Sequence, residues 1–255
     1  MPVFQQFTYS CILEGMTSIS ALIHGCESGT NNRIILAVLV DQAKKRSKYR
    51  EIGYLKSMSS LLGFQLEFVS GEQIEALSQG NTHGGIIALC GDRTYLDCSS
   101  VASDGFWVFL DGVEDPFNLG FTIRSLYAAG ADGIVLPPQN RLCVPGIVAK
   151  SSAGTSELMD IRVSDPENAL LQFKAAGYHV VCAGIRDSVS IYDANLVKPL
   201  LLVVGGEKRG ISRTILDQAD QIIRIDYGRS FNGSLSAASA ATVIAFEVLR
   251  QNTNA

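Results

Sequence analysis

The stretch from residue 200 to residue 250 constrains the fold more than any other part of the chain. An apolar strand is expected at 200–204, followed by a turn of two glycines and an acid at 205–207, a short helix and a second strand at 222–226. The final helix opens at 236–242 with small residues on every face, where an ordinary amphipathic helix has a stripe of large apolar residues. An alanine-rich buried helix is the simpler interpretation of that run alone. Taken together with the glycine turn, however, this run of small residues predicts that the whole stretch forms one pocket.

The composition is that of a globular protein with one large domain or two smaller ones. The 255 residues are 47% hydrophobic and 18% charged. No apolar run approaches the roughly 18 residues of a membrane span, and the first residues do not resemble a secretion signal, so we expect a cytoplasmic protein without membrane contact. Six cysteines without a Cys-x-x-Cys pair and three histidines predict reduced thiols and no metal site.

The net charge of −4 argues against a protein that holds nucleic acid by bulk electrostatics, but it leaves room for a local basic patch. Residues 44–50, from Lys44 to Arg50, place five cations and one tyrosine directly after an apolar strand at 34–40. Two interpretations stay open for this run. It is either a solvated loop or helix face, or an edge that contacts phosphates.

The order of predicted elements divides the chain at a linker. Residues 1–98 alternate strands and helices (a helix at 52–62, a strand at 64–69, a helix at 71–79 and a strand at 86–90) and predict a small α/β domain. A linker follows at 99–105. In residues 106–255, five or six short buried strands alternate with helices, which predicts a parallel sheet with helices on both faces. Expected strands lie at 106–110, 134–136, 160–163 and 178–182, and expected helices at 148–153, at 165–176 and from an N-cap at Asp115.

The unusual residues of the second domain follow its strands, where open parallel sheets bind ligands. Asp111, Asn118 and Arg124 follow the first strand. Because helical side chains lean toward the N-terminus, Arg124 is expected to lie across Gly120 and to point back toward Asn118. A surface arginine on an amphipathic helix is the alternative that these residues leave open. A glutamate directly after two glycines is expected to be partly buried, and Arg124 is the partner that we predict for Glu207 in a desolvated site.

Three motifs in this domain resemble those of the SpoU/TrmH-type (SPOUT superfamily) RNA 2′-O-ribose methyltransferases. They lie at residues 110–124, at 202–210, and from 223–227 through 234–235, and residues 150–155 match a secondary signature. The resemblance implies a C-terminal trefoil knot, bound S-adenosyl-L-methionine, a homodimer formed through this domain, and rRNA or tRNA as the partner. Residues 1–98 more weakly resemble a ribosomal-protein-like RNA-binding domain that often precedes this catalytic domain.

The resemblance also implies roles for particular residues. The family assigns activation of the ribose 2′-hydroxyl to the arginine that matches Arg124. Because a guanidinium group is essentially always protonated, we expect Arg124 instead to orient this hydroxyl and to stabilise the developing negative charge. Asn118 would position the ribose or phosphate, and Glu207 would hold Arg124. The remaining catalytic candidates are Ser234 and Ser236. The residues implied in cofactor binding are Leu136, Ala183, Gly184, Gly205, Gly206, Glu207, Ile225, Tyr227 and Leu235.

The third motif departs from the family pattern. Ser236 stands where the family usually has asparagine, and a hydroxyl lacks the reach of an amide and its separate donor and acceptor atoms. Asp226 and Tyr227 stand where a Pro-Met pair is usual. Two hypotheses therefore stay open, an active RNA methyltransferase and a non-catalytic paralogue that binds RNA or cofactor. A nucleotide-dependent oxidoreductase ranks below both, because the segment 205–210 has neither the P-loop ending nor the spacing of a dinucleotide-binding loop.

Overall fold

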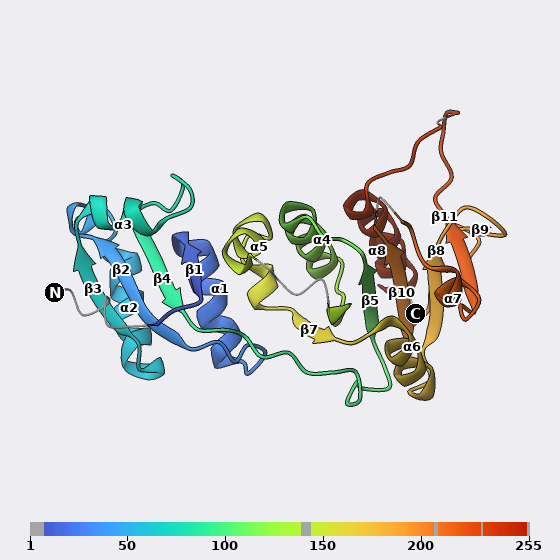
Figure 1. The fold of residues 1–255 in the computed structure, drawn as a ribbon, viewed down its shortest axis with the longest axis horizontal. Helices are drawn as coiled ribbons and strands as arrows, with labels where there is room; N and C mark the ends of the chain where they lie inside the picture. Colours follow the sequence, from blue (N-terminus) through green and yellow to red (C-terminus); the bar gives the residue numbers. More distant parts are fainter. Residues whose placement is uncertain (1–7, 139–143, 207–208, 231, 254–255) are drawn as a thin grey trace. The chain divides into compact units, whose positions relative to one another are not determined.

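The computed structural model describes residues 8–138, 144–206, 209–230 and 232–253. The chain forms two compact units (Figure 1). Unit 1 comprises Met1–Thr94 with Val144–Leu158, and unit 2 comprises Tyr95–Cys143 with Met159–Ala255. The predicted linker lies just after the first of these boundaries. The segment 144–158, which we expected in the second domain, packs with unit 1 instead.

Unit 1 is built on a four-stranded sheet in the order β1-β4-β2-β3. Strand β4 runs antiparallel to both of its neighbours, whereas β2 and β3 are parallel. The strands are β1 (Cys11–Glu14), β2 (Ile35–Asp41), β3 (Gln65–Val69) and β4 (Ile86–Cys90). The helical segments are α1 (Gly15–Glu27), η2 (Gln42–Lys44), α2 (Tyr49–Leu62), α3 (Gly71–Leu77), α5 (Pro145–Ser151) and η4 (Thr155–Glu157).

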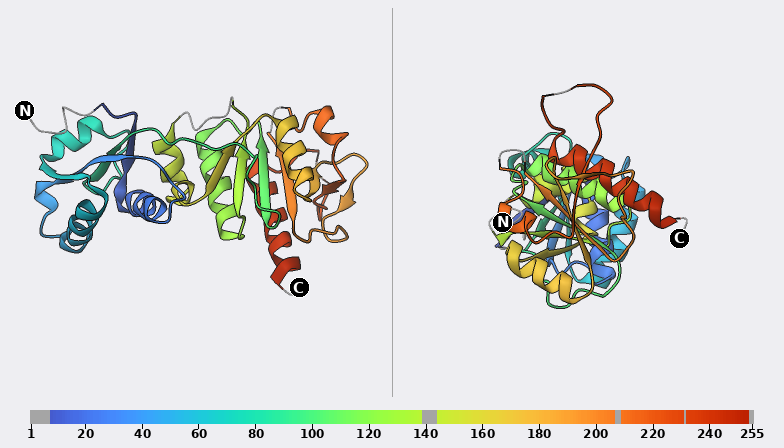
Figure 2. Two further views of the ribbon diagram at one scale, coloured as in Figure 1. Left: turned by 90° about the horizontal axis from the view of Figure 1, so that it is seen from below. Right: turned by 90° about the vertical axis from the view of Figure 1, so that its right-hand side faces the viewer.

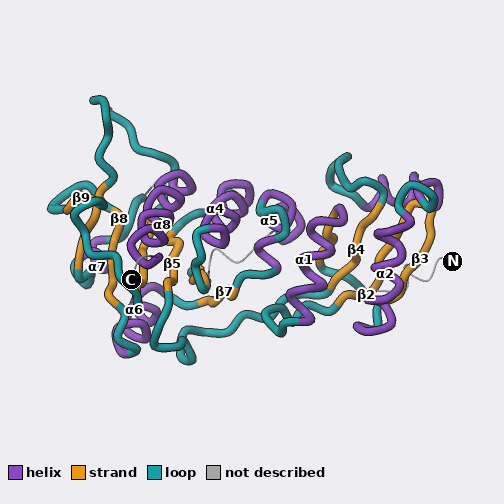
Figure 3. The backbone as a smooth tube through the Cα atoms, turned by 180° about the vertical axis from the view of Figure 1, so that it is seen from behind, coloured by secondary structure: helices purple, strands orange, loops and turns teal. Residues whose placement is uncertain are grey.

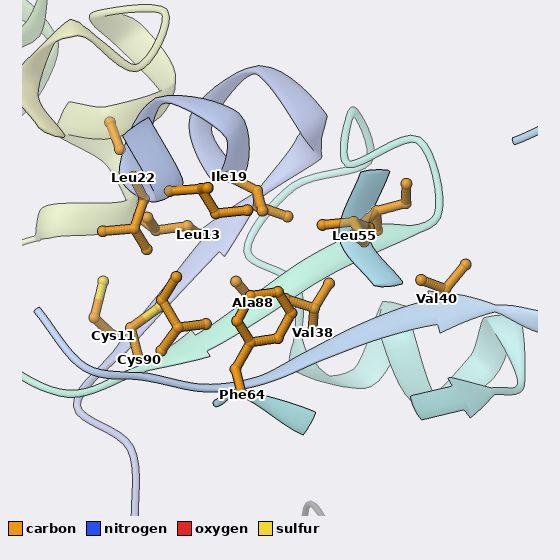
Figure 4. Packing of buried hydrophobic residues seen from close by; sticks show 14 of the residues in the cluster. Cys11, Leu13, Ile19, Leu22, Val38, Val40, Leu55, Phe64, Ala88 and Cys90 are labelled. Atoms are coloured by element: carbon orange, nitrogen blue, oxygen red, sulfur yellow. The ribbon is translucent and has the colours of Figure 1, made fainter. Parts of the chain in front are cut away.

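Both faces of this sheet are apolar, because successive strand residues point to opposite sides. Val38 and Val40 of β2 lie in one core cluster with residues of α1 and α2, including Leu22 and Leu55 (Figure 4). The intervening residues of β2 lie in a second cluster with Ile74 of α3. Helices therefore cover both sides of the sheet, as the near-continuous apolar strands predict.

A buried ion pair explains why the segment 144–158 belongs to unit 1. The carboxylate of Glu157 lies 3.3 Å from Arg33 Nε, and both side chains are almost fully buried. The amide of Asn31 donates to the same carboxylate at 2.7 Å, and Arg93 donates to the carbonyl oxygen of Ser156 at 2.8 Å. Helix α5 begins at Pro145, three residues earlier than predicted, because proline is well suited to the first turn of a helix.

Unit 2 is built on a seven-stranded sheet in the order β7-β6-β5-β10-β8-β11-β9. Every pair of neighbouring strands is parallel, which confirms the predicted sheet. Figure 1 draws its strands as arrows, and Figure 3 shows them from behind. The short strand β9 was not predicted, and β11 ends two residues before the predicted strand because its pairing with β9 stops at Arg224. The strands are β5 (Phe106–Asp111), β6 (Gly133–Leu136), β7 (Asp160–Val163), β8 (His179–Ala183), β9 (Val189–Ser190), β10 (Leu200–Gly205) and β11 (Gln221–Arg224).

Helices cover both faces of this sheet as well. Trp107 and Phe109 of β5 lie in a core cluster with residues of α6 and α7. The alternate residues of β5 point to the other face, where α8 packs against α4 and against β10. The helices are α4 (Pro116–Ala128), α6 (Pro166–Ala175), α7 (Arg213–Leu216) and α8 (Ala237–Thr253).

The small residues at the start of α8 allow the close packing against α4. Ala237, Ala241 and Ala245 of α8 are buried, as is Gly120 of α4. Between β11 and α8, residues 225–230 and 232–235 belong to a long loop that stands out from unit 2 (Figure 2). None of the helices in the described part of the chain is long and apolar enough to cross a membrane.

Candidate functional site

The candidate site lies at the carboxyl edge of the unit 2 sheet. Strands β5 and β10 are neighbours at its centre, and Gly205 at the end of β10 is in register with Asp111 at the end of β5. From β5 the chain continues to β6 on one side of this pair, whereas β8 and β11 lie on the other side. Ligands bind at such a reversal of strand order, beyond the carboxyl ends.

Parallel strands bring most of the predicted cofactor residues to this edge. Leu136 ends β6, Ala183 ends β8 and Gly205 ends β10, while Ile225 directly follows β11. Leu136 is fully buried and the other three are half-buried. The N–H of Gly184 donates to the carbonyl oxygen of Ile223 at 2.8 Å. These residues are scattered over some ninety positions of sequence, so only the parallel sheet brings them together.

The turn after β10 requires glycine because backbone segments approach it closely. The N–H of Gly206 donates to the carbonyl oxygen of Asp111 at 2.5 Å. A Cβ atom on Gly206 would lie 2.1 Å from the carbonyl oxygen of Gly112, and one on Gly205 would lie 2.4 Å from the carbonyl carbon of Gly210. The turn closes with a hydrogen bond of 3.0 Å from Gly210 N–H to the carbonyl oxygen of Gly206. Sequence reasoning found Gly205 and Gly206 but missed Gly112, whose place directly after a buried strand was the available signal.

Asp111 is a further polar group at this edge. Burial raises the pKa of its carboxyl group above the ordinary value. Sequence reasoning noted its position after the strand but did not include it among the site residues.

Helix α4 starts as predicted. Asp115 is its N-cap and Pro116 its first residue, and the Asp115 carboxylate accepts the N–H of Asn118 at 2.8 Å. Asn118 is half-buried, and its carbonyl oxygen accepts the Thr122 hydroxyl at 2.7 Å. Residues six positions apart differ by about 120° around a helix axis, so Asn118 and Arg124 leave α4 on different faces. Helix geometry therefore does not support the predicted alignment of Arg124 with Asn118.

Arg124 is exposed in the single chain, where we expected a desolvated site. It follows Phe117 and Phe121 on one stripe of α4, and these two side chains are 53% and 50% exposed. Within the described residues Arg124 makes no hydrogen bond or ion pair. Glu207, its predicted partner, lies outside the described residues. The helical spacing of residues 117, 121 and 124 predicts that Arg124 shares one face of α4 with the two phenylalanines. This shared face was not recognised from the sequence.

The third motif forms the entrance to α8. Ser236 precedes the helix, and its Oγ accepts the N–H of Ser239 at 3.2 Å and donates to Ser239 Oγ at 3.0 Å. It is therefore an N-cap, a position at which serine and asparagine are both favoured. The N–H of Leu235 donates to the hydroxyl of Tyr227 at 3.1 Å, which links the two ends of the long loop. Ser234 is exposed in that loop.

The described residues contain no group of three or more histidine, cysteine, aspartate or glutamate side chains placed to hold a metal ion. The groups at this edge include backbone donors and acceptors, hydroxyl groups and the Asp111 carboxyl group, whose pKa is raised, whereas Arg124 lies on an exposed face of α4.

Comparison with known proteins connects this edge to a family. The profile of the SpoU rRNA Methylase family matches residues 105–246. A protein of Staphylococcus saprophyticus assigned to the TrmH family of tRNA/rRNA methyltransferases is 28% identical over 233 residues, which are 88% of this chain and 92% of that protein. The 23S rRNA (guanosine-2′-O-)-methyltransferase RlmB of Haemophilus influenzae is 31% identical over 199 residues, 74% of this chain and 80% of RlmB.

A solved structure shares the fold. The AdoMet-bound rRNA methyltransferase from Sinorhizobium meliloti superposes with a TM-score of 0.79, covering 94% of this chain and 87% of that one at 21% identity. The matched residues 105–246 contain β5, the glycine turn after β10 and the start of α8, which are the elements that form the carboxyl-edge site. The chain therefore belongs to the SpoU rRNA methylase family.

Proposed function

We propose that the chain is an S-adenosyl-L-methionine-dependent RNA methyltransferase that modifies a ribose 2′-oxygen of rRNA or tRNA. The observation that carries the proposal is the convergence of all three motifs. The ends of β5 and β10 are in register, and α4, which contains the second half of the first motif, packs against α8, which follows the third motif. Family membership and the activity named for the Haemophilus influenzae relative support the reaction type.

The residues at the sheet edge fit the proposed cofactor. Ala183, Gly184, Gly205 and Gly206 carry no bulky side chains, so a ligand could approach their backbone, and the buried Leu136 ends β6 at the same edge of the sheet. Such a site suits a ligand with an adenine ring and many hydrogen-bonding atoms. When bound, the cofactor supplies a methyl group on a positively charged sulfur. Ile225, Tyr227 and Leu235 would complete the site from the long loop, where the Tyr227 hydroxyl already accepts the Leu235 N–H.

Arg124 is the proposed catalytic residue. A guanidinium group stays protonated at neutral pH, so it donates hydrogen bonds and does not accept the proton of the 2′-hydroxyl. Donors aimed at the oxygen that gains negative charge lower the barrier, and orienting that oxygen lowers it further. Asn118 would position the ribose or its phosphate, Glu207 would hold the guanidinium, and Ser234 and Ser236 would contribute hydroxyl groups from the loop.

A homodimer would complete the site. The exposed stripe of α4 that carries Arg124 also carries Phe117 and Phe121, and Tyr127 is exposed next to it. On α8, which packs against α4, Phe246 is 46% exposed and lies beside exposed Val243 and Leu249. A second copy that covers these apolar side chains would remove water from around Arg124 and thereby strengthen its hydrogen bonds. We also propose that unit 1 binds the RNA substrate and that the protein acts in the cytoplasm.

The strand order supports the proposed trefoil knot. Strand β10 lies between β5 and β8, although β6, β7 and β8 all precede it in the chain. After β11, on the far side of β8, the chain returns to α8, which packs against α4 and β10. The chain thus inserts β10 into the middle of the sheet and then returns to α8. Such a path is suited to threading the C-terminal segment through an earlier loop.

A non-catalytic paralogue is the second candidate function. The hydroxyl of Ser236 donates to Ser239 Oγ and caps α8, so its hydrogen is already engaged in a hydrogen bond within the chain. This observation favours a site that binds the cofactor with little turnover.

Methyl transfer from tritiated S-adenosyl-L-methionine to bulk cellular RNA tests the proposal. We expect the wild type to incorporate the tritium label into RNA. The labelled nucleotides should resist cleavage by alkali at the bond that follows the modified ribose. Arg124→Ala should lower the rate by at least about 100-fold, comparable to the loss of an oxyanion donor. It should leave the fold intact, because Arg124 is exposed.

Arg213→Ala is the matched control, because it removes another exposed arginine of unit 2, on α7. Full activity of Arg124→Ala would overturn the role of Arg124. Cofactor binding by calorimetry without any transfer would favour the non-catalytic paralogue, and absence of both would refute the proposed function.

A further inference from the structure

The basic run of unit 1 is the strongest sequence feature that the methyltransferase site does not use. In the structure the run extends from the end of η2 into the first turn of α2, at the edge of the unit 1 sheet where β2 ends and β4 begins. The turn before β4 lies directly beside it: Asp41 N–H donates to the carbonyl oxygen of Gly85 at 2.8 Å. A Cβ atom on Gly85 would lie 3.0 Å from Lys44 Cγ. We call residues 44–50 and 81–85 together the basic edge.

The cations of the basic edge are close together. Lys48 N–H donates to the carbonyl oxygen of Lys44, and Ile52 N–H donates to that of Lys48, so the run is a compact helical segment leading into α2. At about 1.5 Å of rise per residue, its five cations lie within roughly 10 Å along the segment. That spacing lets one surface contact several neighbouring phosphates.

Most of this charge is not neutralised within unit 1. Lys48 pairs with Glu51 at 2.8 Å. Lys44, Lys45, Arg46 and Arg50 form no ion pair with a carboxylate among the described residues, and all four are exposed. The carboxylate of Asp41 caps η2 by accepting the N–H of Ala43. Five cations therefore face two carboxylates between residues 41 and 51, in a chain whose net charge is −4.

Aromatic and polar groups accompany the cations. Tyr49 is 64% exposed, and its hydroxyl oxygen accepts a hydrogen bond from Arg50 Nε at 2.9 Å. Lys45 Nζ lies 3.9 Å from the centre of the Phe68 ring, which holds this cation at the end of β3. In the neighbouring turn Asn81, Thr82 and Gly84 are exposed. An exposed ring among cations is the combination that binds single-stranded nucleic acid, since bases stack on the ring while phosphates meet the charges.

We propose that the basic edge binds a single-stranded segment of the RNA substrate, with Lys44, Lys45 and Arg46 on its phosphates and Tyr49 stacked on a base. The inference rests on the proposed function for its substrate class. It adds a second RNA contact, in unit 1, to the one at the carboxyl edge of unit 2.

Charge removal in the full chain tests the phosphate contacts. The variant Lys44→Gln, Lys45→Gln, Arg46→Gln keeps most of each aliphatic stem and removes three charges. The control Lys56→Gln, Lys174→Gln, Lys198→Gln removes three exposed charges from outside the run. Fluorescence anisotropy with a labelled single-stranded RNA of mixed sequence gives the affinity at several salt concentrations. The probe's duplex with its complementary strand is titrated in parallel.

We expect the first variant to bind the single strand about 10- to 100-fold more weakly at moderate salt, with the slope of log K against log salt smaller by about 2. The control variant should keep both values. Tyr49→Ala should weaken binding to the single strand by at least about fivefold, whereas Tyr49→Phe keeps the ring and should bind like the wild type.

The possible failures are distinguishable. Unchanged affinity and salt slope in the first variant would overturn the inference, even if the wild type methylates RNA. Equal losses in both triple variants would overturn it as well, because bulk charge would then explain binding. Tighter binding of the duplex, with no effect of Tyr49→Ala, would overturn the single-strand assignment. A wild type that binds this RNA but neither binds S-adenosyl-L-methionine nor transfers methyl groups would refute the proposed function and leave the basic edge supported.

Discussion

Replacing Gly206 by alanine should damage both the stability of unit 2 and its cofactor site. The added Cβ atom would lie 2.1 Å from the carbonyl oxygen of Gly112 and 2.7 Å from its carbonyl carbon. Both are backbone atoms in the turn after β5, so no flexible side chain can move aside. Relief of the contact requires that the turns after β5 and β10 separate by about 1 Å, given van der Waals separations of about 3.5 Å between carbon atoms.

Two terms contribute to the expected cost. Overpacking of a tight site typically costs about 1–3 kcal/mol. Separation of the turns also breaks the hydrogen bond from Gly206 N–H to Asp111, worth about 1 kcal/mol. The free energy of unfolding of unit 2 should therefore fall by about 2–4 kcal/mol. At about 2–4 °C per kcal/mol, the melting temperature should fall by roughly 5–15 °C.

The only tryptophan reports on this unit directly. Trp107 is buried in β5, next to the strand that leads into the altered turn, so its fluorescence during urea unfolding follows unit 2. Gly228→Ala is the matched control, because a Cβ atom on Gly228 meets nothing within 4 Å and its φ is not positive. Calorimetric titration with S-adenosyl-L-methionine measures the second effect, which should be a loss of affinity of at least about tenfold. A stability loss below about 0.5 kcal/mol with unchanged cofactor affinity would refute the close-approach argument.

Two further predictions concern the cap of α8 and a buried carboxylate of unit 1. Ser236→Ala should lower the stability of unit 2 by about 1 kcal/mol in urea unfolding, because it removes the acceptor for Ser239 N–H, whereas Ser236→Asn should be nearly neutral; equal effects of both would contradict the capping role. Burial alone would raise the pKa of Glu14, but hydrogen bonds from Lys150 and from the N–H groups of Gln79 and Gly80 lower it overall. Because the folded-state pKa lies below the unfolded one, the Glu14 carboxylate stabilises the folded state above about pH 4–5, and this contribution is lost as the pH falls through the folded-state pKa. Scanning calorimetry from pH 7 to acid should therefore show a smaller loss of stability on acidification for Glu14→Gln than for the wild type, and identical pH profiles would contradict the assignment.

Local features of the fold were predictable because they depend on neighbouring residues. Asp115 and Pro116 start α4 where a short polar side chain and a fixed φ favour a first turn. The apolar strands from β2 to β8, and β10, were visible as short runs between turn residues, and their alternation with helices implied the parallel sheet of unit 2. The same pattern predicted that Ala183 and Gly205 lie at the carboxyl ends of buried strands, and they are the last residues of β8 and β10.

The sequence alone determined that two α/β regions exist, that the second has a parallel sheet, and which family motifs it carries. Tertiary structure decided which distant segments meet: that β10 lies between β5 and β8, that Gly206 contacts Gly112, and that Glu157 joins its helix to unit 1 through Arg33. It also showed that Ser236 caps α8 and that Arg124 is exposed beside two phenylalanines. The physical reason is the distance along the chain over which each kind of interaction acts. Capping, turn formation and strand propensity act over a few residues, whereas strand order and close backbone approach depend on how the whole chain packs around its two cores.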